Sequence, residues 1–569
     1  MNIVERKFSP SSALMLMKAG VHPVLARVLT ARGVKAKEEA AQTLDHLIPY
    51  TELLNATKMA SILADAVITQ KRLLILADYD ADGATACSVG VRALKAFGAN
   101  VGYLIPNRLE HGYGLTPEIA RIACAAEPRP DYIVTVDNGI ASHAGIAEAN
   151  RLGVPVLVTD HHLPGDTHPD AACIVNPNQH GCTFASKAMA GCGVMYYVMW
   201  ALQDELIARG HDGYENMDPN FAIDDLLPIV AIGTVADVVA LDANNRILVN
   251  EGITRIRKGH SFAGVDALAK ISGRSPRELS TSDIAFGIGP RINAAGRLES
   301  MDAGVETLTT DSVARAEALA QILHDINDRR KEIEGEMTDE AVRRLLTDVQ
   351  PDRYTAVLHA EDWHQGVIGI VAGRIKERIW RPTFVLANGK NGELKGSGRS
   401  IPGFHLRDAL DMVDRRCPGL LPKFGGHAMA AGVTVRAGGL EEFTKAFEQV
   451  ARELLKPSDL LQNLEVDGAL DAGEMSLETV KVIKSQVWGQ AFPEPAFCDE
   501  FRVVEARPIG GGQHLRLTLE KNGQRYQAVK FRHADGTPAA KVKAVFKLDA
   551  NTFRDETNLQ LLVEHLEAA

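Results

Sequence analysis

Cysteine is scarce in this chain. Its 569 residues include seven cysteines, an odd number, and no two of them form a C-x-x-C pair. Disulfide frameworks and zinc ribbons both need cysteines paired at short spacing, so the pattern argues against either. Reduced thiols in a reducing compartment are the better interpretation. We expect Cys87 to be a small core residue rather than a nucleophile.

Long apolar runs are also missing. No stretch reaches the length and apolarity of a membrane helix, although the hydrophobic content of 46% and the charged content of 24% are ordinary for a globular protein. Residues 1–10 contain Glu5, Arg6 and Lys7 without an apolar segment, which is unlike a signal peptide. We therefore expect a cytoplasmic protein that makes no membrane contact.

Positive charge is in deficit overall. A net charge of −11 argues against general adhesion to nucleic acid. Residues 501–547 are an exception, because ten Lys and Arg residues stand there against three acidic ones, a net charge of +7. Such a segment is a candidate surface for a phosphate backbone. A solvated strand face explains the same residues equally well.

Two catalytic signatures are absent from the sequence. There is no Walker A motif, so ATP-driven mechanics has no support, and there is no Ser-His-Asp esterase signature. The chemistry must therefore come from other residues.

Four apolar runs each lead into acidic residues or into acidic residues with histidines. The runs are residues 73–77, 132–136, 154–159 and 226–232, and the polar residues that follow them are Asp78, Asp80, Asp82, Asp137, Asp160, His161, His162 and Asp237. Short, continuously apolar runs are typical of strands buried on both faces of a parallel sheet. Ligands of such sheets bind beyond the carboxyl ends of the strands. We expect all four clusters to converge on one edge.

Clustered carboxylates repel one another unless cations hold them. Aspartate with histidine and no nearby cysteine suits Mn²⁺ or Mg²⁺ better than structural zinc. The alternative is that each aspartate merely caps the following helix. Capping explains Asp137 or Asp237 alone, but it does not explain three aspartates in five positions together with Asp-His-His elsewhere.

At these residues the chain resembles the DHH phosphoesterase superfamily. The strings at 76–83, 291–297, 396–400 and 425–427 are LADYDADG, RINAAGR, GSGRS and GGH. They resemble the RecJ family of bacterial single-strand-specific 5′→3′ DNA exonucleases within that superfamily. The motifs occur in family order, and the resemblance extends from about Leu73 to the C-terminus.

The resemblance implies an α/β multidomain fold in four parts. They are an N-terminal helical region with a parallel-sheet DHH phosphoesterase domain (1–310), a connecting helix (311–348), a DHH-associated α/β domain (349–455) and an OB-fold β-barrel that binds DNA (456–569). The apolar spacing over 311–346 itself predicts a helix of roughly 50 Å, with a coiled-coil dimer helix as the alternative. Five short strand patterns after residue 500 and a hairpin signal at Asn522-Gly523 favour a small barrel.

The resemblance also assigns a centre with two Mn²⁺ or Mg²⁺ ions. Asp80 would bind one ion and Asp82 the other, Asp137 would bridge both, and His161 and Asp237 would complete the ligands of the second ion. Two ions about 4 Å apart stabilise the attacking and leaving oxygens of a displacement. Many family members have a histidine where this chain has Leu76, so the first ion would lose a ligand that Asp78 could replace.

Two further residues of the same cluster, His162 and Asp160, are candidates for catalysis. His162 would contact the phosphate or protonate the leaving oxygen, or alternatively orient its neighbours. Asp160 would not bind a metal ion directly but would contact the residues that do.

Six residues are candidates for substrate binding. Ser397 and Arg399, within a glycine-rich turn at 396–400, fit a pocket for a terminal phosphate. Arg291 and Arg297 would flank a loop facing the DNA, Arg108 is a further candidate, and His427 would face the substrate from the associated domain. The alternatives are a surface or ion-pair role for each arginine and a loop-packing role for His427.

The function implied by this resemblance is metal-dependent hydrolysis of single-stranded DNA from the 5′ end to mononucleotides, in recombination and repair. A single-stranded DNA-binding protein and a RecQ-type helicase are the implied partners, and we expect a monomer. One rival is another DHH phosphoesterase acting on short oligonucleotides, cyclic dinucleotides or pyrophosphate. The other is a non-catalytic replication scaffold, which the retained acidic residues disfavour.

Overall fold

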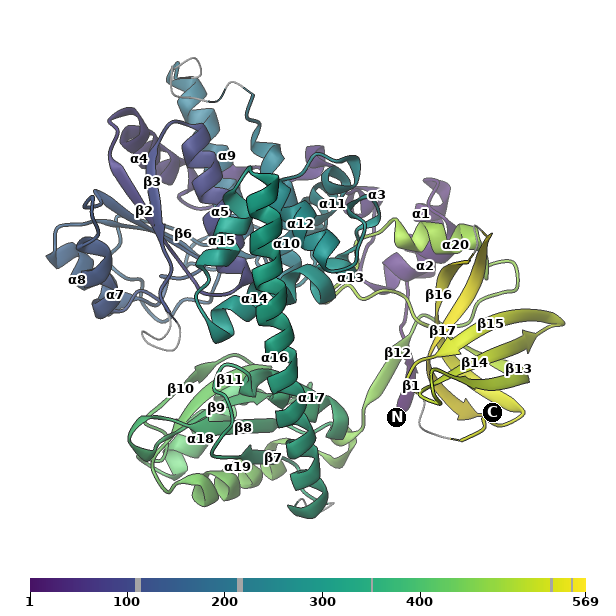
Figure 1. Cartoon of the computed structure of the whole chain (residues 1–569). Coiled ribbons are helices and arrows are strands. Elements are labelled where there is room, and N and C mark those ends of the chain that lie inside the picture. Colours follow the sequence, from purple (N-terminus) through teal and green to yellow (C-terminus); the bar gives the residue numbers. More distant parts are fainter. Residues whose placement is uncertain (108–113, 212–217, 219, 349–351, 533–535, 554–555) are drawn as a thin grey trace. The chain divides into compact units, whose positions relative to one another are not determined.

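The computed structural model describes every residue of the chain except 108–113, 212–217, 219, 349–351, 533–535 and 554–555 (Figure 1). The chain folds into two compact units. The larger unit contains residues 4–296, 300–323 and 465–569, and the smaller contains residues 1–3, 297–299 and 324–464. None of the helices in the described part is both long and apolar enough to cross a membrane.

A five-stranded parallel sheet carries the acidic clusters of the larger unit. Its strands, in spatial order, are β3 (Asn100–Leu104), β2 (Arg72–Ala77), β4 (Tyr132–Val136), β5 (Val156–Thr159) and β6 (Cys173–Val175). In the register, Ala77 pairs with Val136, and Val136 pairs with Thr159. The three strands therefore end level with one another. The expected convergence of the first three clusters on one sheet edge is confirmed.

The fourth apolar run is a helix, and the expectation of a strand there was wrong. Residues 226–232 lie at the start of α10 (Leu227–Ala236), whose first turn contains Pro228. Every residue from Leu227 to Thr234 is buried. A helix buried on all sides shows no apolar periodicity, so such a run cannot be told from a buried strand by pattern alone. Asp237 thus reaches the site from the C-terminus of a helix rather than from a strand end.

Helices cover both faces of the sheet. Leu73 and Ile75 pack into a core with α4, α5 and α9, whereas Leu74 and Leu76 pack into a second core with α7 and α8. The helices numbered up to α15 are α1 (Pro10–Lys18), α2 (Pro23–Ala31), α3 (Lys37–Ala40), α4 (Ala56–Ile68), α5 (Ala81–Ala96), α7 (Pro117–Cys124), α8 (His143–Arg151), α9 (Gly191–Ala208), α10 (Leu227–Ala236), α11 (Ala243–Lys258), α12 (Ala263–Ile271), α13 (Thr281–Asp283), α14 (Gly289–Leu298) and α15 (Asp302–Thr309). Alternate residues of one strand thus serve two cores, as in strands buried on both faces.

The long helix expected after residue 310 is α16 (Val313–Asp348), a single helix of 36 residues (Figure 1). At 1.5 Å per residue it is about 54 Å long. Ala320 and Leu323 pack into the core of the larger unit, whereas Met337 and Ala341 pack into a core of the smaller unit. The apolar positions are therefore buried against two different cores. This division explains why no single coiled-coil register runs along the helix.

The smaller unit contains a mixed sheet of five strands. In spatial order they are β10 (Lys423–Gly426), β11 (Ala430–Val435), β9 (Leu394–Arg399), β8 (Thr383–Asn388) and β7 (Ala356–His359). Only β7 and β8 are parallel. The helices α17 (Ile368–Ile379), α18 (Leu406–Arg416) and α19 (Leu440–Leu454) complete the unit.

The glycine-rich segment 396–400 is mainly a strand, so the expectation of a turn was wrong. Gly396 and Gly398 belong to β9, and both are buried. A Cβ on Gly398 would lie 2.5 Å from the Phe384 ring, and one on Gly396 would lie 2.7 Å from Val433. The two glycines therefore leave room for the side chains of Phe384 and Val433. Because side chains alternate along a strand, Ser397 and Arg399 lie on the opposite face of the sheet.

A closed five-stranded barrel forms the C-terminal part of the chain, as expected (Figure 1). Its strands are β13 (Phe497–Ile509), β14 (His514–Lys521), β15 (Gln524–Lys530), β16 (Lys541–Phe553) and β17 (Glu556–Ala568). Asn522 and Gly523 have φ values of 52° and 78°. Positive φ at both central residues is the signature of the type I′ hairpin that their sequence predicts.

The barrel segment is tied to the N-terminal region within the larger unit. The helix α20 (Leu477–Lys484) contacts α2. The strand β1 (Asn2–Glu5) pairs with β12 (Asn463–Val466), and the residues of this pair are divided between the two units. Arg32 Nη1 lies 2.7 Å from Asp467 Oδ1, and both side chains are 2% exposed. A buried ion pair of this kind is strongly destabilising when one partner is removed.

Candidate active site

Asp80 and Asp82 lie at the start of α5, directly after β2. Asp80 caps this helix, because its Oδ1 accepts hydrogen bonds from the N–H groups of Asp82 at 2.9 Å and Gly83 at 3.0 Å. The capping alternative is therefore correct for one oxygen of Asp80. A cap uses a single carboxylate oxygen, so it does not preclude a ligand role for the other.

Asp82 is held by the N-terminus of another helix. Its Oδ2 accepts from the Gly191 N–H at 2.6 Å, and its Oδ1 accepts from the Cys192 N–H at 2.9 Å. These are the first residues of α9, where the helix dipole favours negative charge. Asp82 is 1% exposed, so its orientation is set by the packing of α5 against α9.

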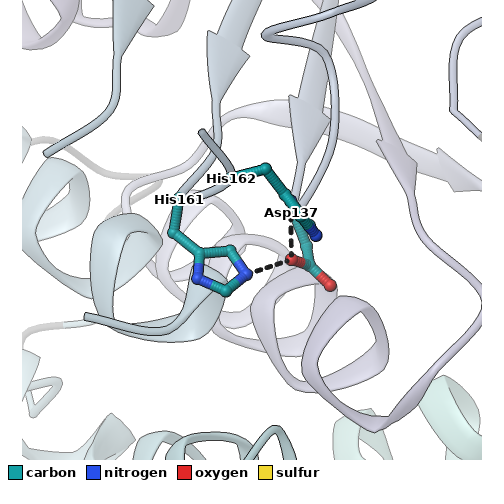
Figure 2. A group of neighbouring side chains, drawn as sticks. All are labelled: Asp137, His161 and His162. Carbon is teal, nitrogen blue, oxygen red and sulfur yellow. Dashed lines mark ion pairs between the residues drawn. The ribbon is translucent and has the colours of Figure 1, made fainter. Parts of the chain in front are cut away.

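Asp137 and His161 face each other across the sheet edge (Figure 2). The distance from His161 Nε2 to Asp137 Oδ1 is 3.1 Å, and Asp237 Oδ2 and Asp82 Oδ2 lie 3.6 and 3.9 Å from the same nitrogen. Asp137 has a φ of 61°, and its Oδ1 is buried without a hydrogen-bond partner among the described groups. A buried carboxylate oxygen without a donor requires a cation or a proton.

His162 is fixed by Asp160. Asp160 Oδ1 lies 2.8 Å from His162 Nδ1, and it also accepts from the N–H groups of His161 at 2.7 Å and of His162 at 3.1 Å. The other oxygen of Asp160 accepts from the Ile140 N–H at 2.9 Å. Both oxygens of Asp160 therefore accept hydrogen bonds from neighbouring groups, and the bond to Nδ1 fixes the His162 ring.

Burial shifts the pKa values of several side chains in this cluster. Burial raises the pKa of Asp82, Asp137 and Asp237, and neighbouring carboxylates raise the pKa of each further. Burial lowers the pKa of His161. Burial opposes the charge of His162, but its hydrogen bond with Asp160 raises its pKa to about 9. Carboxylates under such mutual repulsion are stabilised as anions by a bound cation.

Among the described residues, three groups of side chains have the spacing of metal ligands. They are Asp78 with Asp80 and Asp137, Asp82 with His161 and Asp237, and Asp137 with His161 and His162. Asp137 belongs to two of these groups, and the oxygen-rich donor set suits Mn²⁺ or Mg²⁺. Leu76 is fully buried in the sheet, whereas Asp78 lies within the first group. The residues present therefore fit two ions, with Asp78 placed where a further ligand is needed.

The predicted substrate residues belong to both units. Arg291 and Arg297 lie on the helix α14, so the expectation of a loop was wrong. Arg291 is 7% exposed and donates to the Gly287 carbonyl at 2.6 Å, whereas Arg297 donates to the Gly366 carbonyl at 3.3 Å. Arg108 lies outside the described residues.

Ser397 and Arg399 contact each other in the smaller unit. Arg399 Nη1 donates to Ser397 Oγ at 3.1 Å and to the Gly398 carbonyl at 2.8 Å. A Cβ added at Gly369, at the start of α17, would lie only 2.8 Å from Ser397 Oγ. Glycine at this position therefore leaves space beside the Ser397 hydroxyl. His427 is exposed between β10 and β11, and its N–H donates to the Ala430 carbonyl at 2.8 Å.

Several supporting residues were not identified from the sequence. Asn293 Oδ1 accepts from the Ala81 N–H at 2.9 Å and so holds α14 against the start of α5. Asn178 Nδ2 donates to the His161 carbonyl at 2.6 Å. A Cβ on Gly191 would lie 2.8 Å from the Asp137 Cβ. Asn293 lies inside the RINAAGR string, which was a usable signal, but Gly191 and Asn178 belong to no motif.

Comparison with known proteins gives consistent matches along the chain. Family models described as "DHH family, N-terminal domain", "DHHA1 domain" and "RecJ OB domain" match residues 72–234, 352–453 and 466–565. The single-stranded-DNA-specific exonuclease RecJ of Salmonella typhimurium is 43% identical over 97% of this chain and 96% of its own length. The RecJ of Escherichia coli is 42% identical over the same shares of the two chains.

Solved structures give the same result. The crystal structure of RecJ from Thermus thermophilus in complex with Mn²⁺ matches with a TM-score of 0.83 and 30% identity, covering 100% of this chain and 80% of that one. A crystal structure of exonuclease RecJ bound to manganese is 36% identical, with a TM-score of 0.59, and covers 71% of this chain and 96% of that one. On its acidic and histidine motifs, its fold and these matches, the chain belongs to the RecJ family of single-stranded-DNA-specific exonucleases.

Proposed function

We propose that this chain hydrolyses single-stranded DNA from the 5′ end to mononucleotides, using two Mn²⁺ or Mg²⁺ ions, in recombination and repair. The observation that carries the proposal is Asp137 Oδ1, which is buried and lacks a hydrogen-bond donor among the described groups while it contacts the acidic and histidine cluster. Such an oxygen is suited to bridge two cations. Bound ions of this kind stabilise the attacking and leaving oxygens of a phosphodiester.

The metal-binding residues divide into two sets. Asp80, supported by Asp78, serves the first ion, and Asp82, His161 and Asp237 serve the second. Asp137 is shared by both sets. The spacing supports the division, since the donor atoms lie within 4.8 Å of one another in the group Asp78, Asp80 and Asp137 and in the group Asp82, His161 and Asp237. Asp137 Oδ1 also lies 3.1 Å from His161 Nε2.

His162 is the residue that handles the leaving oxygen. Its Nδ1 is hydrogen-bonded to Asp160 at 2.8 Å, which fixes the ring, so Nε2 is the nitrogen assigned to the leaving oxygen. Asp160 is a positioning residue, because its contacts run to His161, His162 and Ile140 rather than outward. The arrangement matches that of a general acid oriented by a buried carboxylate.

The substrate residues are assigned to different parts of the strand. Ser397 and Arg399 hold a terminal phosphate, which a guanidinium and a hydroxyl recognise through charge-assisted hydrogen bonds. Arg297, Arg108 and His427 are further candidates for contact with the strand. Arg291 supports the strand path from its buried position on α14.

The barrel is the DNA anchor of the proposal, although most of its basic residues are already paired. Six of the ten Lys and Arg residues between 501 and 547 form ion pairs with carboxylates: Arg502, Lys521, Arg525, Lys541, Lys543 and Lys547. Arg507 and Arg516 instead lie opposite each other on β13 and β14. Two like charges in register are unfavourable unless an anion lies between them.

Two nearby aromatic side chains, Phe531 and His514, extend the proposed DNA-binding surface formed by Arg507 and Arg516. Phe531 is 59% exposed and contacts the His514 ring edge-on, with the ring centroids 5.2 Å apart. The exposed Arg532 follows Phe531 and donates its N–H to His514 Nδ1 at 3.1 Å. Cations beside an exposed aromatic ring are the usual means of binding single strands without sequence preference.

The remaining assignments follow from family role. They are action as a monomer in the cytoplasm, association with a single-stranded DNA-binding protein and a RecQ-type helicase, and the four-part division at residues 310, 348 and 455. The family models support this division, because they match three separate segments. The missing Walker A motif agrees with a separate helicase opening duplex DNA.

The test uses matched strands labelled at either end, incubated with the purified chain and Mn²⁺ or Mg²⁺. We expect 5′-labelled single strands to yield labelled mononucleotide at once and 3′-labelled strands to shorten progressively, while duplex resists. Preferential hydrolysis of cyclic dinucleotides or pyrophosphate would instead identify the other DHH phosphoesterase class. Absence of any hydrolysis by folded, metal-loaded protein would favour the scaffold.

A further inference from the structure

A cavity of about 380 Å³ lies beside Asp160 and His162, and its described lining includes none of Asp78, Asp80, Asp82, Asp137, His161 and Asp237. Residues 115–117 and 139–145 form its walls together with Asp160, His162 and Leu163. It lies wholly in the larger unit, between the start of α7, the start of α8 and the end of β5. Its volume is at the small end of the range for ligand sites, which suits part of a nucleotide rather than a longer segment of strand.

The lining of the cavity indicates an uncharged occupant. It includes no Lys or Arg among the described residues, and the protonated ring of His162 is already paired with Asp160, so a phosphate would find no guanidinium or ammonium group there. Leu115, Ile140 and Leu163 provide apolar surface, and Leu163 is 64% exposed although it directly follows His162. The Thr116 hydroxyl and both Asp160 oxygens already accept backbone hydrogen bonds. The accessible wall beside His162 is therefore mainly apolar.

The proposed reaction determines which part of the strand lies there. To release the terminal nucleotide with its own 5′ phosphate, the water oxygen bonds to the next phosphorus, the P–O3′ bond breaks, and O3′ takes up a proton. The shortened strand keeps the attacked phosphate as its new 5′ end. If His162 serves O3′ through Nε2, then the deoxyribose that carries O3′ lies on the His162 side of the site.

We propose that this cavity receives the deoxyribose of the 5′-terminal nucleotide, and that Leu163 disfavours a 2′-hydroxyl there. The inference rests on the proposed function. The carbon that would carry a 2′-hydroxyl is bonded to the carbon that carries O3′, so this hydroxyl would lie next to the group that His162 contacts. Burial of a hydroxyl against an apolar wall leaves it without a hydrogen-bond partner. Apolar pockets reject an added hydroxyl by about 10²-fold, which sets the size of the expected preference for DNA.

The test compares two 5′-phosphorylated DNA strands that differ only in a single ribonucleotide at the 5′-terminal position. We expect the natural chain to prefer the all-deoxy strand by roughly 10- to 100-fold in kcat/KM. Leu163→Asn offers the hydroxyl a partner and should reduce this ratio several-fold, chiefly by improving use of the ribonucleotide. Leu163→Met keeps the wall apolar and should leave the ratio unchanged. Inhibition by deoxyadenosine and adenosine 5′-monophosphates gives a second readout, whose ratio should change in the same direction.

Ile122→Asn is the matched control, because Ile122 is an exposed apolar residue of α7 that does not line the cavity. It should behave as the natural chain does. An unchanged ratio in Leu163→Asn, or an equal loss on both strands, would overturn the sugar assignment while leaving 5′-end hydrolysis intact. A natural chain that fails to hydrolyse the all-deoxy strand would contradict the proposed function itself.

Discussion

Asp137 combines burial, a positive φ and an oxygen without a hydrogen-bond donor among the described groups. Asp137→Asn keeps the shape of the side chain, and asparagine tolerates the left-handed backbone. We expect the variant to fold and to lose at least about 100-fold in activity, since even residues that only support metal ligands typically contribute 10- to 100-fold. Steady-state hydrolysis at saturating Mn²⁺, with circular dichroism for folding, measures this. Substantial turnover by the folded variant would contradict the bridging role.

Arg399 and Ser397 provide a test of end recognition at the same scale. Arg399→Ala should impair use of 5′-phosphorylated strands about tenfold or more, because a charge-assisted hydrogen bond contributes about 1.5–3 kcal/mol. Strands with a 5′-hydroxyl should lose little, since they offer the guanidinium no partner. The measurement is kcat/KM on strands that differ only at the 5′ end.

Lys395→Ala is the control for Arg399, because Lys395 lies on the same strand and donates to Thr434 Oγ1 at 2.8 Å. It should treat both kinds of strand alike. An equal loss on phosphorylated and hydroxyl ends in Arg399→Ala would reassign Arg399 to general backbone contact.

Most individual residues of the metal cluster could be predicted because their motifs are local. Asp80, Asp82, Asp160, His161 and His162 each lie within a few residues of a strand end, so period and spacing predicted their position at the sheet edge, whereas their individual roles came from the family resemblance. Arg291 shows the limit of this reasoning. Its motif was informative, but its burial and its bond to the Gly287 carbonyl depend on how α14 packs.

Among the elements, the start of α9 sets the geometry of two carboxylates. A Cβ on Gly191 would lie 2.8 Å from the Asp137 Cβ and 2.9 Å from its Oδ1. Gly191→Ala should therefore lower metal affinity by about 10- to 100-fold and destabilise the fold by about 1–3 kcal/mol through overpacking. Metal titration and denaturant unfolding measure the two effects.

Gly335→Ala in α16 is the matched control for Gly191→Ala, because a Cβ there has no neighbour within 4 Å. It should leave metal affinity unchanged and stabilise the helix by about 0.5–1 kcal/mol. If Gly191→Ala retained full affinity, α9 could not be the element that positions Asp82 and Asp137.

The barrel strands supply the next element-scale prediction. Arg507→Ala with Arg516→Ala should weaken binding of single-stranded DNA and make its salt dependence shallower by about one unit per lost phosphate contact. The comparison is Arg502→Ala with Lys541→Ala, which removes the same charge from residues already paired with Glu520 and Glu500. Equal salt slopes in the two double variants would reject the Arg507–Arg516 surface as the anchor.

For the whole molecule, removal of metal should lower stability. The cluster places several carboxylates within a few ångströms, and cations offset their repulsion. Mn²⁺ at 100 times its Kd should stabilise the native state by about 2.7 kcal/mol, seen as a higher Tm than in chelator. Asp137→Asn should show a much smaller increase. A Tm insensitive to Mn²⁺ in the natural chain would argue against a metal centre.

The connection between the barrel and the N-terminal region affects how the barrel should be tested. Deletion of everything after about Leu455 would remove Asp467, the partner of Arg32, and Phe492, which packs against Arg246. Such a truncation would expose apolar surface of the N-terminal helices and leave Arg32 buried and unpaired. Surface substitutions on the barrel therefore separate DNA anchoring from folding, which truncation cannot do.

The sequence by itself determined the sheet edge with its three level clusters, the long helix, the hairpin at Asn522-Gly523 and the barrel strands. These features depend on local period, turn chemistry and motif order, all of which act within a few residues. Only the tertiary structure decided that Asp237 lies at the end of a helix, that position 191 requires glycine, and that most Lys and Arg residues of the barrel form ion pairs. Each of these features depends on contacts with residues far away in the sequence. For Asp237, the preceding apolar run is buried on all sides, so it shows no periodicity that would distinguish a helix from a strand.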